Sequence, residues 1–366
     1  MHSRPSETIR WGIVGAGVMA EQFASDLALT EKAALTAVSS RTPEKAAAFA
    51  ARHGNVTAHA ACQALLGDPS VDAVYIATPN DTHFEIARAA IESGKAVLVE
   101  KPLVTTSRDA ARLATLASER GVFLMEAMWT RFLPAIAKTR ALIGEGAIGE
   151  VTRLRGSLAF HHPYDAESRF YSRAHGGGAM LDLGIYGISL ARFLMGEPLE
   201  VDGEWRQAPS GVDKSASVAL LFDRDVEAHL SCSFEHEGDN CFIIEGSDGA
   251  LVLQPPFIAA NAVLHCRNRL AARLAAFPGQ SALSRAIRKF VRGAPLPGIQ
   301  RHAFPRAGYG LQYEIAAVGD ALRAGHTHDR RSAPLDTART LEIIETVLAE
   351  QNRKGRGPLS PSAPPA

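Results

Sequence analysis

Three side chains in this sequence are candidates for moving a proton. Lys101 stands between Glu100 and Pro102 directly after a short apolar run, and Asp182 and Tyr186 lie four residues apart in a segment predicted to be helical. Residues four apart share one face of a helix, so this carboxylate and this phenol would point the same way. A phenol has a pKa of about 10, and a nearby ammonium group lowers that pKa and makes the phenol a better proton acceptor.

Each of these residues also has an ordinary structural explanation. A lysine that follows a strand is most often a surface residue, an acid in the first helical turn is favoured by the helix dipole, and a tyrosine among apolar neighbours usually belongs to the core. Taken singly, these explanations are the better ones. The combination becomes informative when one fold brings the three side chains to the same place.

The elements that must position these residues begin with alternating strands and helices. Short apolar runs separated by helical patterns are typical of parallel βαβ units and indicate an α/β domain. A helix from Ser107 is expected to use this serine as its N-cap. The predicted strands are 9–14, 34–39, 73–77, 96–99 and 122–125, and the predicted helices are 18–29, 82–92, 107–120 and one starting at Pro43.

A glycine-rich turn joins the first predicted strand to the first helix. Gly15, Gly17 and Ala20 form a GxGxxA pattern in which Val18 and Met19 open the helix. The first glycine permits a tight turn, the second lets backbone amides approach a pyrophosphate, and the helix N-terminus favours its charge. This context predicts a Rossmann dinucleotide site.

The end of the second strand indicates which dinucleotide binds. An NAD site usually places a carboxylate there for the ribose hydroxyls, but this chain has Ser40, Arg41 and Thr42, and no acid before Glu44. Arg41 can pair with a 2′-phosphate, and the hydroxyls can donate to it. The sequence therefore favours NADP over NAD, although Arg41 could also be a plain turn residue.

Further candidate cofactor contacts follow two later strands. The carboxyl ends of parallel strands meet at one edge of the sheet, where ligands bind in this architecture. The residues expected there are Thr78, Pro79, Asn80 and His83 after one strand, and Glu100 and Lys101 after the next.

From about residue 150 the pattern changes to closely spaced strands with turns between them. The strands 151–160, 216–222, 226–234, 241–246 and 250–253 predict a mostly antiparallel sheet, accompanied by helices at 178–195, 310–324 and 335–351. We therefore expect a Rossmann domain at 8–128, a second α/β domain at 129–352 with an insert at about 254–308, and a flexible tail at 353–366.

These segments together resemble the Gfo/Idh/MocA oxidoreductase family over about residues 10–351. The run from Gly121 to Phe132, GVFLMEAMWTRF, resembles the branch that contains dimeric dihydrodiol dehydrogenases, NADP-dependent D-xylose 1-dehydrogenases and glucose–fructose oxidoreductase. Many other members have histidine at the position of Tyr186. The resemblance implies that the second sheet has an open face that often builds a dimer or larger oligomer, and that the peptide before Pro102 is often cis.

The resemblance also implies roles for the three candidate residues. Hydride transfer from a carbinol carbon to nicotinamide requires the hydroxyl proton to leave. We expect Tyr186 to be the general acid/base and Lys101 its partner, although these two roles could be exchanged, and Asp182 to orient Lys101 or a substrate hydroxyl.

The substrate pocket is less defined by the sequence. Trp129, Arg131, Phe160 and Tyr186 are the candidate pocket residues, and Phe170 and Tyr171 could add apolar surface. All the aromatic ones could equally be core. The scattered histidines 161, 162 and 175 lack ligand spacing, so no metal is expected.

Composition excludes several other classes of protein. The 39 Lys and Arg residues equal the 39 Asp and Glu residues, which argues against a nucleic-acid-binding protein. No apolar run reaches a membrane span, and four cysteines without paired spacing favour a reducing, cytoplasmic setting. The insert is basic with helical spacing, and a solvated amphipathic helix or lid explains it better than a membrane or nucleic-acid surface. The basic residues are Arg267, Arg269, Arg273, Arg285, Arg288, Lys289 and Arg292.

The sequence is compatible with two functions of different class. The first is an NADP-dependent oxidoreductase acting on the C1 hydroxyl of an aldose such as D-xylose or D-glucose, with trans-dihydrodiol oxidation as the enzymatic alternative. The second is a non-catalytic dinucleotide sensor that binds a partner protein. The three proton-handling residues favour the enzyme.

Overall fold

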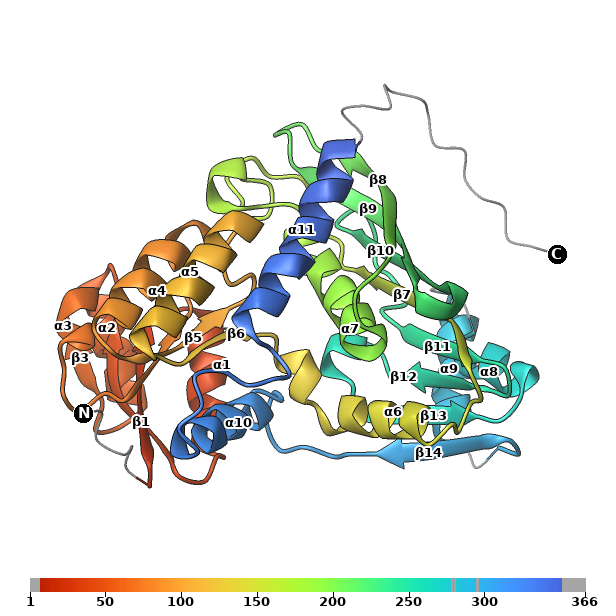
Figure 1. Cartoon of the computed structure of the whole chain (residues 1–366), viewed down its shortest axis with the longest axis horizontal. Helices are drawn as coiled ribbons and strands as arrows, with labels where there is room; N and C mark the ends of the chain where they lie inside the picture. The colour runs from red at the N-terminus through yellow and green to blue at the C-terminus, as the bar shows by residue number, and fades with distance from the viewer. Residues whose placement is uncertain (1–6, 278, 280, 294–295, 351–366) are drawn as a thin grey trace.

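The computed structural model describes residues 7–277, 279, 281–293 and 296–350, so the predicted tail lies outside the described residues. The N-terminal part is a six-stranded parallel sheet with helices on both faces, the doubly wound arrangement of a Rossmann fold (Figure 1). Its strand order is β3-β2-β1-β4-β5-β6. The strands are β1 (Ile9–Val14), β2 (Ala33–Ser39), β3 (Thr57–His59), β4 (Ala73–Ile76), β5 (Ala96–Glu100) and β6 (Leu124–Ala127).

The helices and strands of this layer agree with those predicted from the sequence, except for two short elements and one N-cap. Strand β3 and helix α3 are too short to show a periodic pattern, and the sequence does not predict them. The N-cap of α5 is Thr106 and not Ser107, because the Thr106 side chain accepts a hydrogen bond from the backbone N–H of Asp109. The helices are α1 (Val18–Leu27), α2 (Pro43–Arg52), α3 (Cys62–Leu66), α4 (His83–Glu92) and α5 (Ser107–Arg120).

The second sheet has eight strands and is antiparallel except for the parallel pair β7 and β10. Its order is β14-β13-β12-β11-β7-β10-β9-β8. Three strands at or next to its edges, β8, β13 and β14, are absent from the sequence prediction. The strands are β7 (Val151–Ala159), β8 (Glu200–Gln207), β9 (Asp213–Phe222), β10 (Val226–Ser233), β11 (Phe242–Gly246), β12 (Ala250–Leu253), β13 (Ala262–Cys266) and β14 (Ile299–Ala303).

One face of the second sheet carries the main core of the molecule. Alternate residues of its strands point toward α7 (Ile185–Met195) and α11 (Pro334–Glu350), and α11 also packs against α5 of the Rossmann layer. Residues 173–195 are the one described helical stretch long and apolar enough to cross a membrane, but 67% of its apolar window is buried inside the molecule. That burial is typical of a core helix.

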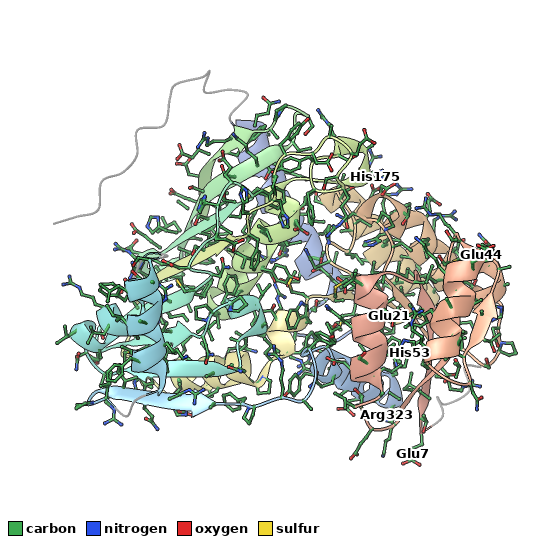
Figure 2. All side chains as sticks on the ribbon, turned by 180° about the vertical axis from the view of Figure 1, so that it is seen from behind. Glu7, Glu21, Glu44, His53, His175 and Arg323 are labelled. Carbon is green, nitrogen blue, oxygen red and sulfur yellow. The ribbon has the colours of Figure 1, made fainter. Side chains whose placement is uncertain are left out.

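The opposite face is covered only at one end. The insert forms α8 (Arg269–Ala275) and α9 (Ala282–Gly293), which pack on β11, β12 and β13 through a separate small apolar cluster. Figure 2 shows these two helices on the near side of the sheet, at the end of the molecule away from the Rossmann layer. Helix α6 (Pro134–Gly144) links the two layers along the chain.

Near its C-terminus the chain returns to the Rossmann layer. Helix α10 (Gln312–Arg323) buries Ile315 and Val318 in the same core as β1 and α1, whereas the domain boundaries expected from the sequence place it in the second domain. The fully buried carboxylate of Asp26 on α1 accepts hydrogen bonds from the backbone N–H groups of Tyr309, Gly310, Leu311 and Gln312 at 2.7–3.3 Å. A negative charge at a helix N-terminus is stabilising, so this contact anchors the returning helix.

We expect Asp26→Ala to destabilise the protein by about 3 kcal/mol, because several buried N–H donors lose a charged acceptor together. The urea unfolding midpoint measures this loss. Glu31→Ala, at an exposed acid shortly after α1, is the matched control and is expected to change little. A midpoint for Asp26→Ala equal to that of the control would contradict the anchoring role.

Candidate active site

Lys101 and Asp182 come together from the two layers. Lys101 follows β5, and its Nζ lies 2.9 Å from Oδ1 of Asp182 and donates to the backbone carbonyl of the same residue at 2.7 Å. The peptide between Lys101 and Pro102 is cis, as the resemblance implies. Both charged side chains are largely buried, with 13% and 17% of their surfaces exposed. The pair therefore fixes an ammonium group at the carboxyl edge of the Rossmann sheet.

Charge and burial oppose each other at this pair. Burial is the largest single influence and disfavours the Lys101 ammonium, but Asp182, Tyr186 and Glu100 together outweigh it, so the pKa of Lys101 is raised. Burial likewise works against the Asp182 carboxylate, and the Lys101 ammonium overcomes it, so the pKa of Asp182 is lowered. Both groups are consequently charged over the whole neutral range.

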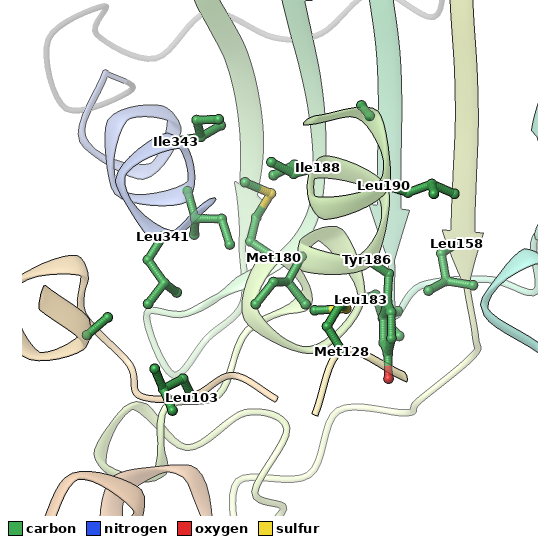
Figure 3. Close-up of a cluster of buried hydrophobic side chains, with 14 of the residues drawn as sticks. Leu103, Met128, Leu158, Met180, Leu183, Tyr186, Ile188, Leu190, Leu341 and Ile343 are labelled. Atoms are coloured by element: carbon green, nitrogen blue, oxygen red, sulfur yellow. The ribbon is translucent and has the colours of Figure 1, made fainter. Parts of the chain in front are cut away.

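Tyr186 projects into the same place from the first turn of α7. Its ring lies at the margin of the apolar cluster and its hydroxyl points away from the helix (Figure 3). The Lys101 Nζ sits over the ring, 4.9 Å from the centroid, and the indole N–H of Trp129 donates to the phenol oxygen at 3.3 Å. The three predicted proton-handling residues are therefore neighbours.

The expected lowering of the Tyr186 pKa is wrong. Burial raises the pKa of Tyr186 to about 12, and the Lys101 ammonium only partly opposes this effect because it lies over the ring face. The phenol is therefore neutral at physiological pH, and it is arranged to donate a proton to a substrate oxygen.

The segment that carries Asp182 owes its position to a π-helical turn. Residues Met180–Gly184 (η4) form this turn, which leads into α7. Gly178 enters it with φ +123°, where a Cβ would collide with the Asp213 carboxylate. Asp213 accepts a hydrogen bond from the backbone N–H of Met180 at 2.6 Å, and burial raises the pKa of this carboxyl to about 6. Sequence reasoning missed Asp213, whose only signal was a lone acid at the start of a strand.

The glycine turn after β1 has the shape that a dinucleotide requires. Gly15 has φ +110°, and a Cβ there would meet the Ala77 carbonyl of the neighbouring loop. Nothing lies within 4 Å of a Cβ built on Gly17, and no side chain caps the N-terminus of α1. Val18 is 73% exposed beside this uncapped end, and Met19 follows it half-buried. The residues present thus fit a pyrophosphate at the helix N-terminus.

The residues after β2 are also free to meet a ligand. Arg41 is exposed and forms no ion pair within the described part of the chain, and Ser40 accepts only a 3.3 Å bond from the backbone N–H of Thr42. This geometry leaves the guanidinium available to an anionic group.

The loop after β4 contacts both layers. Thr78 accepts a hydrogen bond from the Thr82 hydroxyl at 2.7 Å, Pro79 starts a short helical turn, and Asn80 donates its amide to the Gly176 carbonyl at 3.2 Å. The loop is therefore tied to the glycine segment of the second layer as well as lying at the carboxyl edge of the sheet.

His83, which the sequence places among the cofactor contacts, holds two backbone carbonyls in the structure. It is fully buried, and its ring nitrogens lie 2.9 Å from the backbone carbonyls of Pro102 and Thr78. Burial lowers the pKa of His83. This imidazole joins the Thr78 loop to the loop that carries Lys101, and it thereby helps to hold Lys101 in position.

Arg131 is likewise structural and does not line a substrate pocket. Its buried guanidinium donates to the Ser189 hydroxyl and carbonyl of α7 and to the Arg331 carbonyl, and it pairs with Asp336 of α11. Phe160 is half-buried and packs against the main core. Of the four predicted pocket residues, only Trp129 and Tyr186 are thus seen to contact each other.

The other polar and aromatic residues that the sequence offered for the pocket contact different partners. His162 stacks on Phe170 with 4.2 Å between centroids, and Tyr171 is buried and donates to the His162 carbonyl. His175 contacts Asp81 at 3.1 Å, and His161 faces the Glu235 carbonyl. Among the residues that the structure describes, no group of three or more His, Cys, Asp or Glu side chains could hold a metal ion.

A buried acidic cluster beneath the site was not predicted. Glu100 is buried and accepts a hydrogen bond from the Tyr75 hydroxyl, and burial raises the pKa of Glu100. Glu314 of α10 is fully buried, with no hydrogen-bond partner for either carboxyl oxygen in the described structure. Burial, and then the negative charges of Glu100, Asp26 and Glu126, raise the pKa of Glu314 well above its usual value.

Comparison with known proteins agrees with this geometry. Residues 9–128 match the GFO/IDH/MocA oxidoreductase family with an NAD-binding Rossmann fold, and residues 136–252 match the C-terminal domain of that family. The chain is 29% identical over 356 residues to the trans-1,2-dihydrobenzene-1,2-diol dehydrogenase of Homo sapiens (95% of this chain, 97% of the human one). It is 31% identical over 250 residues to that of Mus musculus (67% and 74%).

A solved structure shows the same architecture. The 3-ketoreductase KijD10 from Actinomadura kijaniata, crystallised with NADP and TDP-benzene, superposes with a TM-score of 0.77 at 27% identity. The alignment covers 93% of this chain and 97% of that one.

The unpartnered Glu314 carboxyl predicts an unusual pH dependence of stability. The folded state keeps this proton at pH values above the unfolded-state pKa of about 4.3, so the free energy of unfolding falls as pH rises above that value, by up to about 1.4 kcal/mol per unit. Glu314→Gln cannot titrate, so its melting temperature relative to the wild type should rise as pH increases above that value. Glu119→Gln, at an exposed helical position, is the control. A difference between Glu314→Gln and wild type that does not change with pH would contradict this assignment.

Proposed function

Because the chain belongs to the Gfo/Idh/MocA oxidoreductase family, whose characterised relatives act on CH–OH groups, we propose that it is an NADP-dependent dehydrogenase of a cyclic vicinal diol. The observation that carries this proposal is the meeting of Lys101, Asp182 and Tyr186 at the carboxyl edge of the dinucleotide-binding sheet. A protein that only senses a dinucleotide would have no use for this proton-handling group.

The cofactor assignment rests on two parts of the carboxyl edge of the Rossmann sheet. The uncapped N-terminus of α1 and the Gly15 turn would hold the pyrophosphate, while Arg41 would pair with the 2′-phosphate of NADP. The crystallised 3-ketoreductase KijD10 contains NADP, which supports the same choice. When bound, the nicotinamide supplies or accepts the hydride.

The chain's own residues handle the proton. In the direction of reduction the neutral Tyr186 phenol donates its proton to the carbonyl oxygen, and the phenolate that is left takes a proton from solvent. In the direction of oxidation the phenol first loses its proton to solvent and then accepts the proton of the substrate hydroxyl. Lys101 remains an ammonium, so it stabilises negative charge that develops on the substrate oxygen. Asp182 holds that ammonium in place, and Trp129 fixes the phenol oxygen by donating to it.

Two substrates with a vicinal diol are candidates. The first is an aldose oxidised at C1, and the polar side chains around the site suit several hydroxyls: Arg169 Nη1 lies 4.0 Å from the Asp182 carboxylate that Lys101 also binds. The second is a trans-dihydrodiol, which the names of the mammalian relatives favour. The indole of Trp129 offers apolar surface to either ring.

A homodimer through the open face of the second sheet is the assembly that we propose. Ser157, Ser231 and Ser217 stand side by side across β7, β10 and β9 in the observed register. Small side chains in a row allow a second sheet to approach closely. The face also contains a groove of about 510 Å³ between β8 and the loop that follows β10.

The direct test follows nicotinamide absorbance with NADP or NAD against D-xylose, D-glucose, other aldoses and a trans-dihydrodiol. We expect turnover with NADP on one of the two classes, and Tyr186→Phe should lower kcat by at least about 100-fold while NADPH binding is kept. Tyr164→Phe is the matched control on an exposed tyrosine, whose ring contacts Tyr171 and not Lys101. Persistent NADPH binding with no turnover on any substrate would overturn the enzyme assignment.

Arg41 predicts the preference between the two cofactors. Arg41→Ala should raise KM for NADP by about tenfold or more and leave KM for NAD almost unchanged, because only NADP carries the 2′-phosphate. Steady-state kinetics with both cofactors measure the ratio, and NAD serves as the internal control. Equal changes for both cofactors would show that Arg41 does not read the phosphate.

A further inference from the structure

The insert concentrates positive charge in a protein whose total charge is zero. From residue 249 to residue 313 the sequence has no Asp or Glu but nine Lys and Arg residues. The rest of the chain therefore has nine more Asp and Glu residues than Lys and Arg residues. The overall balance of charge hides this segregation, and for that reason the sequence alone favours a solvated lid.

The structure shows that the insert also exposes large apolar side chains. Leu270 and Leu274 lie four residues apart on α8, and Leu283 and Phe290 lie seven apart on α9, so each pair shares one face of its helix. Leu270, Leu283 and Phe290 are 64–68% exposed, and Leu274 is 37% exposed. The insert is thus apolar on its outer side as well as on the side that packs against the sheet.

The inner sides of α8 and α9 are already packed against the sheet. Ala271, Ala275 and Val291 are buried against Val252 and Leu264 of the sheet. Arg288 also points inward, where it donates to the carbonyls of Phe277 and Gly279 at 2.7 Å and lies 3.2 Å from Asp239. The outer apolar side chains are therefore not needed to hold the helices in place.

Cations lie beside the outer apolar residues. Arg267 and Arg273 are exposed at α8 and Lys289 is exposed on α9, and these three form no ion pair within the described residues. We propose that α8 and α9 together form a docking surface for an anionic lipid bilayer. Leucine and phenylalanine would enter the interface, while arginine and lysine would contact the headgroups.

The chemistry favours a bilayer over other anionic partners. A nucleic acid needs positive charge but gives no reason for three exposed leucines in the same two helices. A protein partner would need its own matching pattern of acids, whereas an anionic bilayer offers negative charge and hydrocarbon at every point. The surface also lies at the end of the molecule away from the Rossmann sheet (Figures 1 and 2).

Vesicle flotation of the full chain tests this proposal. Vesicles of phosphatidylcholine alone are compared with vesicles that contain about 30% phosphatidylglycerol, at low and high salt. We expect at least about tenfold tighter binding to the anionic vesicles, weakened by salt. The double variant Leu283→Ser/Phe290→Ser should lose at least about tenfold of that binding, and Arg273→Ala/Lys289→Ala should lose the preference for anionic lipid.

Matched controls separate docking from folding and from assembly. Leu199→Ser/Leu335→Ser removes two equally exposed leucines elsewhere and should bind as the wild type does. Melting temperature and dehydrogenase turnover of all variants check that the fold is intact. Wild type that does not float with anionic vesicles would overturn the proposal. The proposal would also be overturned if vesicle binding were absent and sedimentation showed a lower oligomer mass for Leu283→Ser/Phe290→Ser. In that case the surface would contact a second copy of the chain.

Discussion

The ion pair between Lys101 and Asp182 is the contact on which the site depends. Its partners come from two different layers, and both are withdrawn from water, where an unpaired charge would be costly. Neither charge can therefore be held without the other. The pair brings the carboxyl edge of the Rossmann sheet and the start of α7 to a defined separation, and the Tyr186 phenol is fixed as a consequence.

Several less obvious residues keep that separation. His83 joins the two loops of the Rossmann edge, and Asn80 joins one of them to the glycine segment before η4. Behind α7, Arg131 and Arg192 both reach Asp336 of α11. These contacts surround the reacting groups without touching them, which is how a precise site is usually supported.

The sequence was informative where chemistry depends on neighbours along the chain. The glycine turn and the missing acid after β2 follow from strand ends and residue types, whereas the meeting of Lys101, Asp182 and Tyr186 follows from the resemblance to the family. What the sequence could not reveal depends on burial and on distant partners. Arg131 and His83 look like ligand-binding residues until their partners are seen, and the return of α10 depends on Asp26, which lies 283 residues before Tyr309. The predicted direction of the Tyr186 pKa shift was wrong because the sequence does not reveal that burial of this phenol outweighs the effect of the Lys101 ammonium.

The π-helical turn that carries Asp182 has a consequence for how this site can change over time. A π turn contains one residue more than the α-helical turn that it replaces, and each residue of an α-helix advances it by about 100°. Loss of one residue between Met180 and Gly184 would regularise the helix but rotate Asp182 away from Lys101. Point substitutions can accumulate around this turn, whereas a single-codon deletion within it would remove the charge partner in one step. Related lineages should therefore differ here by exchange of side chains and not by length.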